Sequence, residues 1–163
     1  MKKLIIAALL IIGSTAYAQA QKMGHANFEE IVTLLPERAA AEKTIQELQQ
    51  KLEGRLNKMV ETYQGKVSEF ESDTTMSQAM QASVAGEIQD LQKRIQEFQQ
   101  TAYTEIETKQ NDLMASMFEK VRAAAVAVGE AEEYTYIFDA SSGALLFAGG
   151  EDVTSKVKVQ LGL

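Results

Sequence analysis

The sequence predicts a mainly α-helical protein with a small β base, in which a long antiparallel helical hairpin is inserted into a small strand-rich association domain. Two observations carry this expectation. Two runs of apolar residues mirror each other around Thr75. Short segments with the composition of β-strands lie before the first run and after the second. Since these segments flank the helical runs, we expect the hairpin to form an arm on a base built from both ends of the chain.

The mirrored runs predict the hairpin and its core. Two antiparallel helices rise by the same distance per residue, so residues that face each other have numbers with a constant sum. Pairing the runs outward from Phe70 and Met80 gives sums of 150 or 151. The turn is therefore expected near residues 73–77. The predicted hairpin core consists of Ile45, Leu48, Leu52, Leu56, Met59, Tyr63, Val67, Phe70, Val84, Ile88, Leu91, Ile95, Phe98 and Ile106.

Residues 1–18 have the form of a secretory signal peptide. Lys2 and Lys3 provide a basic start, Leu4 to Ile12 are apolar, and residues 16–18 form an A-x-A cleavage site, with a second site ending at residue 20. The apolar stretch is too short to span a bilayer, and no cysteine follows it for lipid attachment. We therefore expect a soluble protein of the periplasm.

The charge of the mature chain argues against nucleic acid and anionic lipid as main partners. Cleavage removes two of the 16 basic residues and none of the 23 acidic ones, which leaves a net charge of −9. Such a chain is repelled by polyanions. The complete absence of cysteine also means that stability must come from packing or from association rather than from disulfides.

Helix signals divide the arm from the base. Asn27 is a suitable N-cap for a short helix over residues 28–35, and Glu30 completes a capping-box pattern. Pro36 suits the first position of the first long helix, which is expected to end near Ser72. The returning helix runs into the alanine-rich segment 123–128. The arm is thus expected to cover residues 36–128.

Three glycines interrupt the arm. In the first helix the apolar positions recur every eleven residues, which gives about 3.67 residues per turn and predicts a nearly straight helix. Gly54, Gly65 and Gly86 each cost about 1 kcal/mol relative to alanine in a helix interior. They are either tolerated surface positions or a source of deliberate flexibility.

The base is expected to comprise residues 22–35 and 129–163. Residues 22–26 read as a short strand, residues 134–138 as an aromatic and β-branched strand, and residues 144–148 as a second, well-buried strand. Asp152 or Thr154 can cap a short C-terminal helix.

So few short strands bury too little surface to hold a long arm alone. We therefore expect several chains to pool their strands, with Ile137, Leu145, Leu146 and Phe147 as the shared oligomerisation core.

The chain lacks the residue patterns of enzymes. His25 is its one histidine and lies within the first predicted strand, so a catalytic triad or a metal site has little to build on. No glycine-rich nucleotide motif occurs. Acidic residues on the helices alternate with Lys, Arg and Gln, as on a solvated face. We expect no enzymatic activity, no cofactor and no metal.

The order of elements resembles the Skp, or OmpH-like, family of periplasmic chaperones of Gram-negative bacteria. The likeness is carried by residues 22–27, by Glu30, Ile31 and Pro36, by residues 134–141, and by residues 152–162. It implies a Skp-like homotrimer, in which a shared β-rich base carries three helical arms around a cavity. It also implies a holdase that binds unfolded outer-membrane β-barrel proteins without ATP and prevents their aggregation.

One departure from the family pattern concerns the arm tip. The best-known members have basic tips, which are thought to meet lipopolysaccharide or anionic membrane. Here residues 62–83 carry Lys66 against Glu69, Glu71 and Asp73. Lipopolysaccharide and membrane binding are therefore not transferred to this chain, and apolar contacts must contribute more to holding a client.

The candidate client-binding residues lie at the tip and beside the core stripe: Val60, Met76, Met80 and Tyr103. Methionine is flexible and polarisable, which suits a surface that accepts many sequences. The tip methionines are alternatively tolerated residues of a poorly ordered turn. A structural spacer or fibre protein of the cell envelope is the alternative function.

Overall fold

The computed structural model describes residues 21–163 and divides them into two compact units. The sheet unit holds the described residues up to Phe28 together with Ala123–Gly162, and the arm unit holds Glu29–Arg122. The predicted signal peptide, residues 1–18 with cleavage sites after 18 and 20, lies outside the described residues. Most of the described chain is helical, and its strands form one small parallel sheet.

The sheet unit is built around the strand nearest the N-terminus. β1 (Met23–Ala26) lies between β2 (Tyr136–Asp139) and β3 (Glu151–Asp152), and it runs parallel to both. The register places Met23 opposite Tyr136 and His25 opposite Asp152. Parallel strands need a long connection between them. Here three consecutive helices, which span residues 28–131, provide the connection from β1 to β2.

The prediction of a buried strand at residues 144–148 is wrong. These residues are irregular, and Leu146 is fully exposed. The third strand follows instead at β3, directly after Gly150. A Cβ atom at Gly150 would lie 2.7 Å from the Met23 carbonyl oxygen, so only glycine lets the chain close onto β1 here. Because β2 and β3 occupy both edges of β1, the apolar run 144–148 has no edge of β1 left to pair with.

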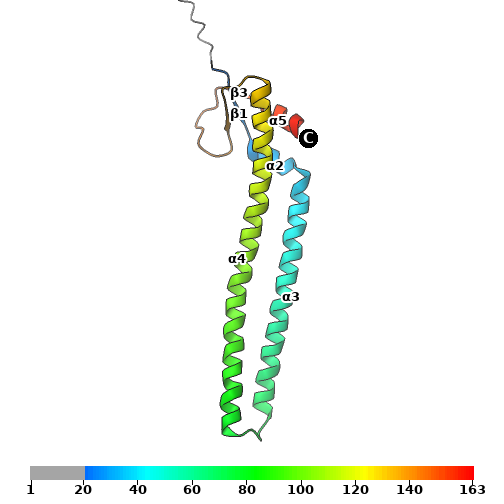
Figure 1. Ribbon diagram of the computed structural model, residues 1–163, viewed down its shortest axis with the longest axis vertical. Coiled ribbons are helices and arrows are strands. Elements are labelled where there is room, and N and C mark those ends of the chain that lie inside the picture. Colours follow the sequence, from blue (N-terminus) through cyan, green and yellow to red (C-terminus); the bar gives the residue numbers. More distant parts are fainter. Residues whose placement is uncertain (1–20) are drawn as a thin grey trace, which may run out of the picture. The chain divides into compact units, whose positions relative to one another are not determined.

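The arm unit consists mainly of two helices that run side by side in opposite directions (Figure 1). A short helix, α2 (Phe28–Leu34), precedes α3 (Pro36–Ser72), which has its proline at the first helical position, where the missing N–H costs nothing. Residues 73–77 connect α3 to α4 (Gln78–Ala131). α4 continues as one helix from the arm unit into the sheet unit.

Each unit has its own set of buried apolar side chains. In the arm unit these are Ile31, Val32, Leu35, Leu52, Val84, Met117 and Val121. In the sheet unit they are Ala26 of β1, Ala124, Ala125 and Val128 of α4, and Val153 and Val157 at α5 (Thr154–Leu161). α5 begins where Asp152 accepts a hydrogen bond from the Thr154 N–H at 2.9 Å, while the Thr154 hydroxyl oxygen accepts one from the Asn27 N–H at 3.0 Å. The start of this helix is thereby joined to the end of β1.

Candidate functional site

The predicted core stripe follows the line where α3 and α4 meet. Leu52 and Val84 are buried. The other members are half-buried and lie between exposed polar neighbours: Ile45, Leu48, Leu56, Met59, Tyr63, Val67, Phe70, Ile88, Leu91, Ile95, Phe98 and Ile106. Two helices that pack only against each other leave their contact residues half-buried, because no third element covers the seam.

Three contacts cross between the two helices beside the stripe. The ion pair of Lys66 with Glu87 and the contact of Arg55 with the Phe98 ring both join residues whose numbers sum to 153, and the ion pair of Lys120 with Glu37 joins residues whose numbers sum to 157. The pairing of the apolar residues with one another stays a prediction.

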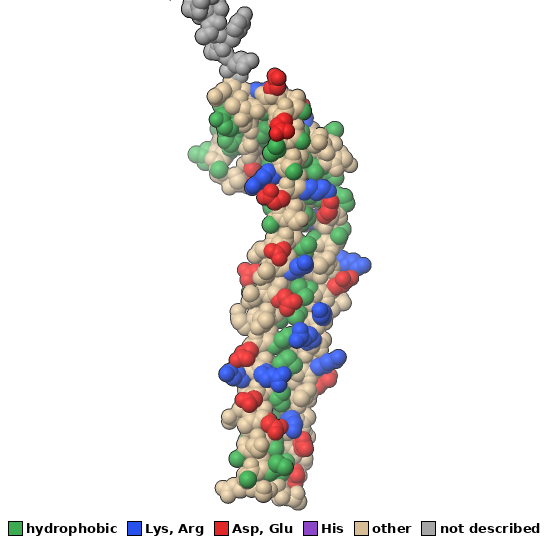
Figure 2. Space-filling view, viewed as in Figure 1, with side chains coloured by type: hydrophobic (Ala, Val, Ile, Leu, Met, Phe, Trp, Pro, Cys, Tyr) green, Lys and Arg blue, Asp and Glu red, His purple; other side chains and the backbone are tan. Residues whose placement is uncertain are grey.

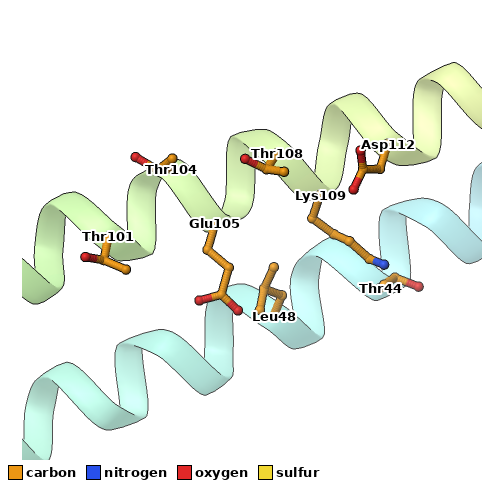
Figure 3. A pocket seen from close by; sticks show the side chains of 8 residues that line it. All are labelled: Thr44, Leu48, Thr101, Thr104, Glu105, Thr108, Lys109 and Asp112. Atoms are coloured by element: carbon orange, nitrogen blue, oxygen red, sulfur yellow. The ribbon is translucent and has the colours of Figure 1, made fainter.

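A groove of about 590 Å³ interrupts the stripe (Figure 3). It is lined by Thr44 and Leu48 of α3 and by six residues of α4 between Thr101 and Asp112. Lys109 stands there where the apolar spacing from Ile106 to Leu113 would place a hydrophobic residue, and its side chain extends toward Thr44 (Figure 3). The hydroxyl of Thr101 donates to the backbone of its own helix at 2.9 Å. We call this local loosening of the seam the seam groove.

The tip of the arm unit is an organised turn. The Asp73 carboxylate accepts hydrogen bonds from the hydroxyl and the N–H of Thr75, at 2.6 and 2.8 Å, and these bonds hold the pKa of Asp73 below its usual value. The Ser77 hydroxyl oxygen accepts a hydrogen bond from the Met80 N–H at 3.3 Å at the start of α4. Met76 is half-buried in this turn, whereas Met80 is 56% exposed.

The other two candidate client-binding residues differ in accessibility. Val60 is half-buried beside the stripe on α3, and Tyr103 on α4 is 67% exposed. Met114, which is not among the candidate residues predicted above, is 46% exposed and lies eleven residues after Tyr103. Eleven residues make about three turns, so both side chains lie on one side of α4. That spacing is the signal that could have identified Met114.

The sheet unit presents apolar side chains to its surface. Of the predicted oligomerisation residues, Ile137 and Leu145 are half-buried, Leu146 is fully exposed and Phe147 is 85% exposed. Tyr136 and Phe138 of β2 are also exposed, and their rings stack at 5.9 Å. Their spacing of two residues, which puts both rings on one face of the strand, is the sequence signal for this pair.

A cavity of about 440 Å³ lies beside these aromatic residues. Met23 and His25 of β1, Phe138 of β2, and Leu145 and Phe147 are among the residues that line it. The Nδ1 atom of His25 is buried and, within the described chain, has no hydrogen-bond partner. One imidazole without a neighbouring acid, thiol or second histidine in this lining does not make a metal or catalytic site.

An ionic cluster that the sequence did not reveal holds the sheet unit together. The Lys156 ammonium lies 2.6 Å from a Glu132 carboxylate oxygen and 2.7 Å from one of Glu151. The Tyr134 hydroxyl donates to Glu151 at 2.5 Å, and Lys22 lies 3.9 Å from the centre of the Tyr134 ring. Hydrogen bonds from Lys156 lower the pKa of both carboxyl groups, and the two carboxylates raise the pKa of Lys156. Four separate segments are thus joined.

Residues 21–163 contain no group of three or more His, Cys, Asp or Glu side chains that could hold a metal ion. No helix in that range combines the length and the hydropathy needed to cross a bilayer.

Comparison with known proteins identifies the family. Residues 22–161 match the family described as outer membrane protein (OmpH-like). A crystal structure of an OmpH-like protein from Caulobacter crescentus, provisionally described as an outer membrane chaperone, aligns with a TM-score of 0.67 at 15% identity, over 86% of this chain and 82% of that one. At this identity the likeness shows the fold alone. No curated protein matches the chain. The family match covers almost the whole described chain, which therefore belongs to the OmpH-like outer membrane protein family.

Proposed function

We propose that this chain is an ATP-independent holdase of the periplasm that binds unfolded outer-membrane β-barrel proteins and prevents their aggregation. Membership of a family of outer-membrane chaperones supports the class of function. The observation that carries the proposal for this chain is the set of exposed apolar side chains on the arm unit, which includes Met80, Tyr103 and Met114. Exposed apolar side chains on a helix surface offer binding sites without requiring a defined partner shape.

The proposed holding surface lies on the arm, residues 36–128. Met76 and Met80 would contact clients at the tip, and Val60 and Tyr103 along the helices. The proposed mechanism needs no nucleotide, cofactor or metal, because holding an unfolded chain requires only reversible contacts. The acidic tip, with Glu69, Glu71 and Asp73, speaks against lipopolysaccharide or membrane binding as part of the mechanism.

The proposed association surface lies on the base, residues 22–35 and 129–163. Phe147 and Leu146 are almost wholly exposed in one chain, and Tyr136 and Phe138 lie on the edge strand β2. Apolar residues in this position favour pairing with another chain. We propose a homotrimer with the arms around a common cavity, in line with the family resemblance.

Light scattering tests both proposals together. A urea-unfolded outer-membrane β-barrel protein is diluted into buffer that contains the mature chain and no nucleotide. Suppressed aggregation that saturates near one client per three chains is the expected result. Unchanged aggregation would contradict the holdase and favour a structural spacer or fibre of the cell envelope. The break in the seam at Lys109 and the three arm glycines favour the holdase over a spacer, for which an uninterrupted seam would be expected.

A further inference from the structure

The two-helix hairpin of the arm unit has two chemically different faces. The ion pair of Lys66 with Glu87, the contact of Arg55 with Phe98 and the seam groove all lie on one side of the seam. Figure 2 shows this side, where acidic and basic side chains flank the hydrophobic stripe. At about 100° per residue, the helical period assigns the remaining exposed residues either to this charged face or to the opposite face.

The opposite face is rich in carboxamides and poor in charge. We call it the glutamine face, and it is defined by Gln46, Gln49, Gln64, Gln92, Gln99 and Gln110, with Val60, Tyr103 and Met114 among them. An eleven-residue period aligns Gln92 with Tyr103 and Met114, and Gln99 with Gln110. Between Gln46 and Met114, the charged residues of this face are Glu53, Glu71 and Glu107.

The amides of this face are free to bind. All six defining glutamines are exposed, and within the described chain their side chains make no hydrogen bond. On the charged face, by contrast, Lys66 is paired with Glu87 at 3.1 Å. Each carboxamide offers two donors and an acceptor. The glutamine face is therefore a strip of unused hydrogen-bonding groups of both kinds.

An extended, unfolded polypeptide matches this strip. Its backbone presents unpaired N–H and C=O groups at every residue, and a carboxamide can pair with either of them whatever the client sequence. The few charged residues of the face are all acidic, so neutral and basic client segments can approach it without repulsion. Tyr103 and Met114 lie about 16 Å apart along the helix, a distance that about five residues of extended chain span. They can contact two separate apolar residues of one client segment.

A second copy of the arm fits this face poorly. Stable interfaces between folded proteins bury on the order of 1,200 Å² or more around a packed apolar core. Here the apolar side chains stand singly between amides, so such a core cannot form. We propose that the glutamine face is the surface of the arm that holds the backbone of an unfolded client. This proposal rests on the holdase function and specifies its binding surface.

Photo-crosslinking tests the assignment of the face. A photoreactive phenylalanine analogue is placed at Gln99 or Gln110 of the full mature chain, and, as matched controls on the same helix, at Thr101 or Thr108 of the charged face. The probe is a urea-unfolded outer-membrane β-barrel protein diluted without nucleotide. We expect at least about fivefold more client adduct from the glutamine positions, since contact is required for crosslinking.

The outcomes separate the two proposals. Equal adducts from both faces, or more from Thr101 and Thr108, would overturn the face assignment while the holdase stands. Adducts between two copies in the absence of client would identify the face as an inter-chain surface and would also overturn the assignment. If the unmodified chain does not suppress aggregation at all, the holdase itself fails and the face assignment fails with it.

Charge insertion gives an independent measurement. The triple variant Gln92→Glu, Gln99→Glu and Gln110→Glu should raise the client Kd about tenfold or more, because it replaces neutral amides by acceptor-only carboxylates. The control variant Thr101→Glu, Thr104→Glu and Thr108→Glu adds the same charge to the charged face and should change the Kd less than about twofold. Equal effects of the two variants would overturn the proposal, and circular dichroism checks that both variants remain helical.

Discussion

Replacing the three arm glycines with alanine should stabilise the arm unit. A Cβ atom at Gly54, Gly65 or Gly86 would meet nothing within 4 Å, so the added methyl groups cause no clash. Each change removes a helix-propensity penalty of 0.8–1.0 kcal/mol, and separate sites add, which gives a gain of about 2.5–3 kcal/mol for the triple variant. Gly150→Ala is the opposite case, because its Cβ atom would lie 2.7 Å from a backbone oxygen of β1.

Hydrogen exchange and calorimetry measure this gain. A stabilisation of about 3 kcal/mol should slow exchange of the arm amides by about 100-fold, at 1.4 kcal/mol per factor of ten. The melting temperature should rise by about 6–10 °C if the arm unit melts with the rest of the chain. Gly150→Ala should lower it. A triple variant with unchanged exchange and melting would refute the reasoning, since it would mean that these glycines do not occupy ordinary helical positions.

The same variant separates the two interpretations of the glycines. If they are tolerated surface residues, the stiffened chain should suppress aggregation as well as the original. If they provide flexibility that client binding needs, suppression should weaken even though stability rises. The comparison is best made with a small and a large β-barrel client, because a large client demands more rearrangement of the arms.

Three further predictions concern the tip, the association surface and the ionic cluster. Met76→Ser with Met80→Ser should weaken client binding without changing the oligomeric state, and an unchanged client Kd would remove the tip from the mechanism. Phe147→Asp should leave the single chain folded, because Phe147 is exposed there. It should dissociate the proposed oligomer, since burying an unpaired charge costs several kcal/mol, and light scattering coupled to size exclusion measures this. A persistent trimer would place Phe147 outside the interface. The pKa values of Glu132 and Glu151 are lowered from 4.5 in the folded chain, so the stabilising effect of these two carboxylates is present above pH 4.5 and is lost as the pH falls below it. Near-ultraviolet circular dichroism of the tyrosines should show the sheet unit loosening in that range. A signal that stays constant to about pH 2 would contradict the role of the cluster.

The helical part of the fold could be read from the sequence because its cause is local. Apolar spacing, the position of Pro36 and strong helix formers all act within a few residues, and they placed α3 at its observed bounds.

The sheet unit could not be predicted to the same depth because its causes are not local. Residues 144–148 are apolar enough for a buried strand, but a strand also needs a free edge, and the edges of β1 are taken by β2 and β3. The two residues of β3 carry no strand signal of their own. The cluster around Lys156 joins residues that lie far apart in the chain. No short segment of the sequence includes both partners of these contacts.

The central place of β1 in the sheet also sets the order in which the chain can fold as it is made. Lys22 contacts Glu132 across 110 residues, and Met23 is paired with Tyr136, whereas the helices of the arm unit form through contacts between near neighbours. A chain that emerges from its N-terminus can therefore complete the hairpin while β1 still has two unpaired edges. Only when residues up to Asp152 are available can the sheet close. A chain cut short before that point would retain the hairpin and lack the complete sheet.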